Sequence, residues 1–333
     1  MQEAKRMGKI VEGHLPGASD KTIAKLGLLG IDGDHEAMTG EDVYKRLIQG
    51  LTVTLRHSSI RPDLPVLLDG LNEKGIDSYD SLLFTTDGST PGFYEKGVLD
   101  FMIKMAIDKG IPPIEAYNMA SYNVANYYNI THLHGMIATG RVANINFLSS
   151  KDDPTPASVL SKGTWVRKNG EQMEDHTEIN WGENGFTPLN LDWEVGYDDL
   201  QFSMPFGIEM VNDVITKPYS ISINPSEELL DPDHDQSFLM LLDRNGKWRI
   251  STMIKGFARG VMGFASSYSN TGDIILIGKS KADMIAAFNR MKEIGGGIAL
   301  AENGEILHDI PLPLSGLLSM KEMPELIEEE KTL

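Results

Sequence analysis

The stretch GKIVEGH at residues 8–14 decides how the N-terminal part of the chain is interpreted. It is a short strand-like run that ends in a histidine, and a helical pattern follows it at residues 19–29. Three further runs, at residues 30–32, 51–55 and 81–85, also end near a polar side chain and precede helical segments. Strands that alternate with helices at this spacing favour an α/β fold with a parallel sheet and crossover connections.

Each predicted strand ends on or near an ionisable residue, namely His14, His35, His57 and Asp87. Catalytic groups of (β/α) barrels lie at the C-terminal ends of the strands, so this regularity favours half of an eight-stranded barrel over a small open sheet. Imidazole and carboxylate groups suit a divalent first-row metal. His14, His35 and Asp87 are therefore candidate metal ligands, although any one of them alone would more often be structural.

The rest of the chain has a different pattern. A single helical pattern spans residues 113–128, and a turn and strand at 136–148 then lead into a polar segment typical of a linker. After residue 193, strand patterns at 238–242, 274–277 and 297–301 and a helical pattern at 282–294 indicate an α+β domain. We therefore predict three regions. They are a C-terminal half-barrel at 1–131, a return strand of a small β-domain with linker at 132–192, and a C-terminal α+β domain at 193–333.

Composition limits the class of function. The 333 residues include 30 basic and 48 acidic side chains, a net charge of −18, which argues against a nucleic-acid partner. No apolar run reaches the 18 residues that indicate a membrane span. Cysteine is absent, which excludes disulfides and thiolate metal sites and fits a cytoplasmic protein.

Several short motifs resemble the bacterial adenine deaminases of the amidohydrolase superfamily. GHLPG at 13–17 and DHE at 34–36 resemble two histidine motifs of that family, and TTD at 85–87 resembles its final aspartate motif. Residues 135–148 resemble the return strand shared by amidohydrolases, and residues 295–316 include two segments that resemble the end of the family's C-terminal domain. The resemblance runs nearly end to end and keeps its order.

The resemblance implies the second half of a metal-dependent (β/α)8 amidohydrolase barrel followed by a C-terminal α+β domain. It also implies a binuclear centre, manganese or iron before zinc, that supplies hydroxide for hydrolytic deamination of adenine to hypoxanthine and ammonia. In that family pattern His14 and His35 would bind metal. Asp87 would bind the other metal or contact the hydroxide, and would pass a proton to the leaving amine. Glu36 would hydrogen-bond a purine ring nitrogen or orient His35.

One departure from the family pattern concerns the metal site. The family's His-x-His and its bridging glutamate would lie upstream of residue 13, so the chain resembles the C-terminal part of a longer protein. We expect it to pair with a missing N-terminal half or to form a homo-oligomer. His132 and His134 have His-x-His spacing, but they follow a helical segment, which favours a surface turn.

A second departure concerns the substrate. RHSS at 56–59 stands where a glutamate-containing segment is common, and Gly88-Ser89 replaces a second acidic residue, as in adenine-deaminase-like paralogues. Arg56, His57 and Ser89 are therefore the candidate substrate-binding residues, although His57 could instead pair with Asp63 or a backbone carbonyl. Two alternatives to a purine-deaminating enzyme stay open. One is a non-catalytic purine-binding or assembly relic, and the other is an amidohydrolase acting on another cyclic amide or ureido substrate.

Overall fold

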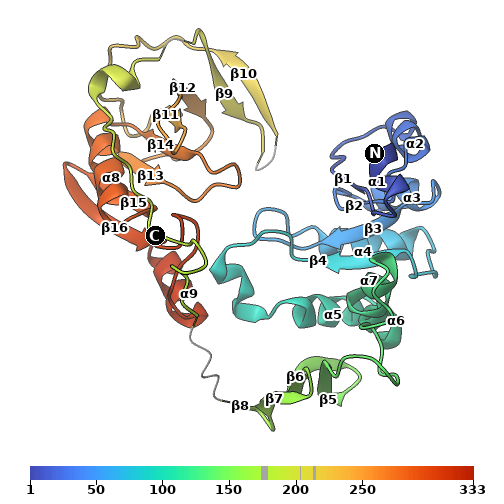
Figure 1. The fold of residues 1–333 in the computed structure, drawn as a ribbon. Coiled ribbons are helices and arrows are strands. Elements are labelled where there is room, and N and C mark those ends of the chain that lie inside the picture. The colour runs from blue at the N-terminus through green and yellow to red at the C-terminus, as the bar shows by residue number, and fades with distance from the viewer. Residues whose placement is uncertain (174–178, 203, 213–214) are drawn as a thin grey trace. The chain divides into compact units, whose positions relative to one another are not determined.

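The computed structural model describes the chain except for residues 174–178, 203 and 213–214 (Figure 1). The elements group into two compact units, Met1–Thr177 and Glu178–Leu333, and each is described by itself. No helix in the described part of the chain is long and apolar enough to cross a membrane.

The first unit begins with the predicted parallel sheet, in the order β1-β2-β3-β4. Its strands are β1 (Glu12–Gly13), β2 (Gly33–Asp34), β3 (Thr52–Arg56) and β4 (Leu82–Thr85). Helices separate or flank these strands, as the α/β interpretation requires. They are α1 (Gln2–Arg6), α2 (Asp20–Leu28), α3 (Gly40–Leu47), α4 (Leu64–Glu73), the 3-10 helix η1 (Pro91–Lys96), α5 (Leu99–Asp108), α6 (Pro113–Ala120) and α7 (Tyr122–Tyr127).

The first two strands are shorter and lie later in the chain than the sequence pattern predicted. The reason is Asp32. Its side-chain carboxylate accepts a hydrogen bond from Val11 N at 2.7 Å, which takes the place of the backbone carbonyl that would accept this bond in a regular sheet. The backbone of Asp32 still donates to Val11 O at 2.9 Å. The two segments therefore run side by side before regular pairing starts at Glu12.

The helices of the first unit begin where the sequence places capping residues. Ser19 and Thr39 accept hydrogen bonds from the backbone of Thr22 and Asp42, which satisfies otherwise unpaired N–H groups at the starts of α2 and α3. The single helix predicted at residues 113–128 is instead two helices that meet at Ser121, whose hydroxyl donates to Tyr117 O at 2.6 Å.

Helices α3 and α4 approach each other through two glycines. A Cβ on Gly70 would lie 2.3 Å from Gly40 Cα. Gly70→Ala should therefore lower the free energy of unfolding by about 1–3 kcal/mol, although alanine is the better helix former by ~1 kcal/mol. Gly27→Ala in α2 is the matched control. Its Cβ would meet only Leu51 Cδ1 at 4.0 Å, so it should be neutral or stabilising in urea denaturation. A Gly70→Ala protein as stable as wild type would contradict this packing argument.

The last part of the first unit forms a second, antiparallel sheet. The polar sequence of this segment had indicated mainly a linker. Its strands are β5 (Ile145–Ser150), β6 (Asp153–Ser161), β7 (Thr164–Lys168) and β8 (Glu171–Gln172). These strands are at least partly exposed along most of their length. The hydrophobic signal that identifies a strand in a sequence is therefore weak here.

The second unit is an eight-stranded sheet in the order β10-β9-β12-β11-β14-β13-β15-β16. All its neighbours are antiparallel except β9 and β12. The bounds are η2 (Tyr197–Leu200), β9 (Phe206–Met210), β10 (Thr216–Ser220), β11 (Gln236–Leu242), β12 (Arg249–Lys255), β13 (Gly263–Ser266), β14 (Ile274–Gly278), α8 (Lys281–Glu293), β15 (Gly297–Glu302), β16 (Glu305–Pro311) and α9 (Met323–Thr332).

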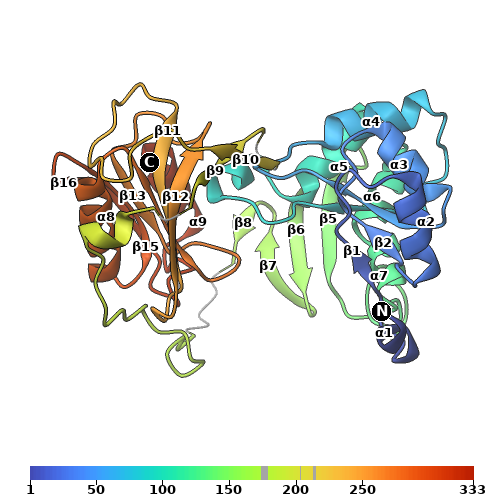
Figure 2. The ribbon, with the colours of Figure 1, turned by 90° about the horizontal axis from the view of Figure 1, so that it is seen from above.

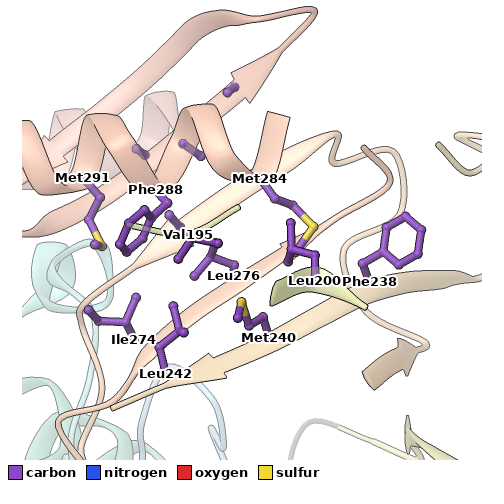
Figure 3. Packing of buried hydrophobic residues seen from close by; sticks show 14 of the residues in the cluster. Val195, Leu200, Phe238, Met240, Leu242, Ile274, Leu276, Met284, Phe288 and Met291 are labelled. Atoms are coloured by element: carbon purple, nitrogen blue, oxygen red, sulfur yellow. The ribbon is translucent and has the colours of Figure 1, made fainter. Parts of the chain in front are cut away.

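Helix α8 packs along this sheet (Figure 2). Its Phe288 and Met291 are fully buried among sheet residues such as Leu276 and Ile274 (Figure 3). The strands predicted near 238–242, 274–277 and 297–301 and the helix near 282–294 are present, so the predicted α+β character of this part of the chain is confirmed.

Candidate active site

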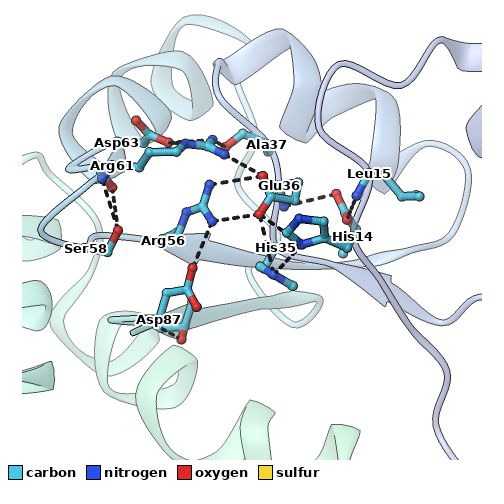
Figure 4. Close-up of polar contacts among 12 residues, drawn as sticks. His14, Leu15, His35, Glu36, Ala37, Arg56, Ser58, Arg61, Asp63 and Asp87 are labelled. Carbon is cyan, nitrogen blue, oxygen red and sulfur yellow. Dashed lines mark hydrogen bonds and ion pairs between the residues drawn. The ribbon is translucent and has the colours of Figure 1, made fainter. Parts of the chain in front are cut away.

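Polar side chains gather at the C-terminal ends of the four parallel strands (Figure 4). His14 follows β1 and His35 follows β2, and His14 Nδ1 lies 3.3 Å from His35 Nε2. Oε1 of Glu36 lies 3.3 Å from His14 Nδ1 and 3.6 Å from His35 Nε2. Within the described residues these three form the one group of His, Cys, Asp or Glu side chains compact enough to hold a metal ion.

The geometry of this cluster suits a divalent metal. Imidazole nitrogens bind zinc at about 2.0–2.1 Å, so two ligands of one tetrahedral ion lie roughly 3.3–3.4 Å apart. The nitrogens of His14 and His35 have that separation. Two imidazole nitrogens and a carboxylate oxygen also form a donor set that zinc, iron and manganese accept. The residues present therefore fit one ion of the binuclear centre that the resemblance implies.

Glu36 is buried, and two arginines hold its charge. Arg56 donates to both of its oxygens, at 2.7 and 3.1 Å, and Arg61 donates to Oε2 at 2.5 Å. All three side chains are at least nine-tenths buried. A buried carboxylate needs such paired donors to stay ionised. Oε1 of Glu36 lies beside the two imidazole nitrogens that face the candidate metal position, so it is placed as a third donor to that position.

Arg56 also links Asp87 to the cluster. Its Nη1 donates to Asp87 Oδ2 at 2.9 Å and to Glu36 Oε1 at 2.7 Å. Asp87 has a backbone φ of 52° and a side chain that is 44% exposed, so its carboxylate remains accessible. Burial raises the pKa of Asp87, but the hydrogen bonds from Arg56 and the Gly88 backbone outweigh it and lower that pKa below its usual value. Asp87 is therefore ionised at neutral pH.

A second buried ion pair joins the loops that carry the histidines, and the sequence analysis missed it. Asp34 accepts from Leu15 N at 2.9 Å, from Glu36 N at 3.1 Å and from Arg46 Nε at 2.6 Å. Arg46 also donates to Leu15 O at 2.8 Å. The signal was present in the sequence, because Asp34 directly precedes His35 and Arg46 interrupts the apolar face of a predicted helix.

His57 and Ser89, two of the three predicted substrate-binding residues, contact the loops around the site. Ser89 Oγ donates to Thr86 O at 2.9 Å and accepts from Ser59 N at 3.1 Å. The His57 ring is 6% exposed and packs against Phe93. The structure thus places His57 in the packing beside the site, and its role in substrate binding stays a prediction. Arg56, by contrast, lies in the centre of the site.

The buried position of His57 predicts acid sensitivity. Burial lowers its pKa, the nearby Lys96 adds to that effect, and Asp63 and the Pro62 backbone oppose it. His57 therefore binds a proton more readily in the unfolded chain than in the folded chain. As the pH falls below about 6.5, protonation stabilises the unfolded chain, and the free energy of unfolding decreases. His57→Phe should reduce the loss of unfolding free energy between pH 7.5 and 5.5 by on the order of 1 kcal/mol.

Urea denaturation at the two pH values measures this effect. His132→Gln, at an exposed histidine, is the control and should keep the full acid sensitivity. Equal acid sensitivity of His57→Phe and wild type would show that the ring does not titrate differently on folding.

Two family models match the chain. The amidohydrolase family model covers residues 1–166, and the adenine deaminase C-terminal domain model covers residues 213–333. A Bacillus anthracis protein named "Putative adenine deaminase" is 55% identical over the whole chain, and one from Bacillus subtilis strain 168 is 53% identical. The chain spans 57% of the length of each of these two relatives. An "Adenine deaminase" of Bacillus velezensis is 28% identical over 96% of the chain.

Proposed function

The chain belongs to the adenine-deaminase-like amidohydrolases, and on this premise we propose that its site takes part in the hydrolytic deamination of adenine to hypoxanthine and ammonia. The family implies an enzyme that uses a divalent metal on a small-molecule substrate. Adenine is the finer proposal, and the names of the relatives and the strand-end cluster support it.

His14 and His35 are the residues proposed to hold the metal, with manganese or iron before zinc. When bound, the metal lowers the pKa of water so that hydroxide is available near neutral pH. Glu36, fixed by Arg56 and Arg61, would offer Oε1 as a third donor beside the two imidazole nitrogens.

Asp87 is proposed as the proton carrier. Water adds to C6 of adenine and ammonia leaves, so one proton must move from the water to the amine. Asp87 is ionised, accessible and joined to the site through Arg56, which suits it to accept that proton and return it to the leaving nitrogen. In the proposal Arg56 touches the substrate through the Asp87 side of its guanidinium, and Ser89 shapes the adjacent loop.

The observation that carries the proposal is the 3.3 Å approach of His14 Nδ1 to His35 Nε2 at the strand ends. The test loads the chain with Mn²⁺, Fe²⁺ or Zn²⁺, measures bound metal, and follows ammonia release from adenine. Stoichiometric metal that His14→Ala and His35→Ala abolish, with hypoxanthine as product, is expected. A chain that binds none of the three metals would refute the enzyme proposal and favour the non-catalytic relic. Bound metal with ammonia release only from cyclic amides or ureido compounds would favour the other amidohydrolase alternative.

We also propose that the parallel sheet pairs with a second copy of this chain. β1 and β4 are edge strands of a four-stranded sheet in the described structure, and open edges favour pairing. Sizing chromatography tests this assembly. A cooperatively melting monomer would count against it.

A further inference from the structure

We propose that Glu12 and Tyr127 are positioning residues that present Nε2 of His35 to the metal. The inference rests on the proposed function, because it takes His35 as a ligand. It concerns residues that neither the sequence motifs nor the compact cluster of His14, His35 and Glu36 includes.

The two nitrogens of His35 face different partners. Nε2 lies 3.3 Å from His14 Nδ1 and 3.6 Å from Glu36 Oε1, on the side of the candidate metal position. Nδ1 lies 3.7 Å from Glu12 Oε1. An imidazole that binds metal through one nitrogen keeps the other protonated, and a carboxylate beside that N–H fixes both the tautomer and the ring orientation. Glu12 lies at ion-pair distance from this nitrogen, somewhat beyond a hydrogen bond, and is the carboxylate proposed to do this for His35.

Tyr127 holds the other oxygen of the same carboxylate. Its hydroxyl donates to Glu12 Oε2 at 2.7 Å from α7, 115 residues further along the chain. Burial, followed by the neighbouring Glu12, raises the pKa of Tyr127 well above its usual value, so the phenol keeps its proton and remains a donor. Glu12 therefore has one oxygen turned to Tyr127 and the other to His35.

The backbone of β2 makes room for this arrangement. A Cβ on Gly33 would lie only 2.5 Å from the Tyr127 hydroxyl oxygen. Because Gly33 lies two residues before His35, the strand that carries the histidine also admits the phenol. β1, β2 and α7 thus meet at one carboxylate, whose side chain is 34% exposed.

The test uses Zn²⁺ as the probe. Its affinity for the full chain is measured by chelator competition at one fixed pH, for wild type, Glu12→Gln and Tyr127→Phe. Loss of such a supporting contact typically weakens metal binding 10–100-fold, and we expect a change in that range for Glu12→Gln and a smaller one for Tyr127→Phe. Tyr128→Phe is the matched control, since Tyr128 packs edge-on against Tyr127 and is half exposed, and it should bind as wild type does.

A second readout separates positioning from general destabilisation. Nitrogen-15 NMR of the metal-free chain, recorded at a pH high enough that the imidazole is neutral, reports the tautomer of His35. We expect the Nδ1–H form in wild type and Tyr128→Phe, and a shift toward the Nε2–H form in Glu12→Gln. A merely structural role for Glu12 would leave this ratio unchanged.

The outcomes distinguish the inference from the proposed function. Tight Zn²⁺ binding by wild type with equal affinity and tautomer in Glu12→Gln overturns the inference and leaves the proposed function intact. No Zn²⁺ binding by wild type counts against the proposed function. In that case the tautomer comparison still decides whether Glu12 positions His35.

Discussion

Replacing Asp87 by asparagine is expected to lower kcat for adenine deamination by about 10²–10⁴-fold, the range typical of a lost proton-transferring group. The amide oxygen of the new side chain could still accept the hydrogen bond that Arg56 donates at 2.9 Å, so the site should keep its shape. The amide could not take up a proton. The effect should therefore appear in kcat more than in KM, measured by the conversion of adenine to hypoxanthine.

Metal content is the decisive second measurement for the Asp87 variant. Asp87 lies outside the compact set of His14, His35 and Glu36, so zinc affinity at that set should change by no more than a few-fold. Asp63→Asn is the control, because Asp63 pairs with Arg61 at the same rim but carries no proton in the proposed reaction. Wild-type kcat in Asp87→Asn would refute the proton-carrier role. Loss of the metal together with the activity would instead make Asp87 a ligand.

The placement of His14, His35 and Asp87 at one edge of the sheet could be anticipated because parallel strands end at a common edge, although Asp87 lies outside the compact cluster. Short-range sequence patterns locate the strand ends along the chain, and the parallel geometry of the sheet brings those ends to the same edge. The predicted strand boundaries were displaced by a few residues, but the predicted positions of the strand ends were not affected. The contact between Asp32 and Val11 already aligns the first two segments before regular pairing begins. A prediction that depends on strand direction is therefore robust to errors of a few residues in strand length.

The partners of these residues could not be anticipated in the same way. The contact between Tyr127 and Glu12 depends on how α7 packs against the sheet, which no local pattern encodes. Likewise, the structure turns the guanidinium of Arg56 onto Glu36 and Asp87, two contacts that the sequence pattern did not indicate. Long charged side chains can reach several partners, so their pairing is decided by tertiary packing.

The strands β5–β8 illustrate a different limit. Exposed and partly buried residues alternate along β7, and both residues of β8 are exposed. A strand of this kind is stabilised by its backbone pairing more than by apolar burial, so its sequence resembles that of a linker. In the second unit, by contrast, α8 and β14 bury fully apolar side chains and were predicted close to their observed bounds.

Arg56→Met is expected to have the largest effect on stability of any single change at the site. The variant would leave Glu36, which is 2% exposed at its side chain, with Arg61 as its remaining arginine partner. Breaking a buried ion pair by removing one partner typically costs about 3–5 kcal/mol, because the other charge stays buried. Asp87 adds less, since its carboxylate is 44% exposed and solvent screens it. Calorimetry that follows the transition of the first unit measures the loss.

The double variant Arg56→Met/Glu36→Gln tells whether the unpaired charge or the lost packing causes this effect. If charge is the cause, Glu36→Gln removes the buried negative charge to which methionine cannot donate a hydrogen bond. The double variant should then be more stable than Arg56→Met. If lost packing is the cause, the two changes should add. Arg56→Lys keeps a charge but not the planar fork that reaches Glu36 and Asp87 at once, so it should fall between wild type and Arg56→Met. A loss below about 1 kcal/mol for Arg56→Met would mean that Arg61 alone compensates Glu36, and that Arg56 is free to serve a substrate.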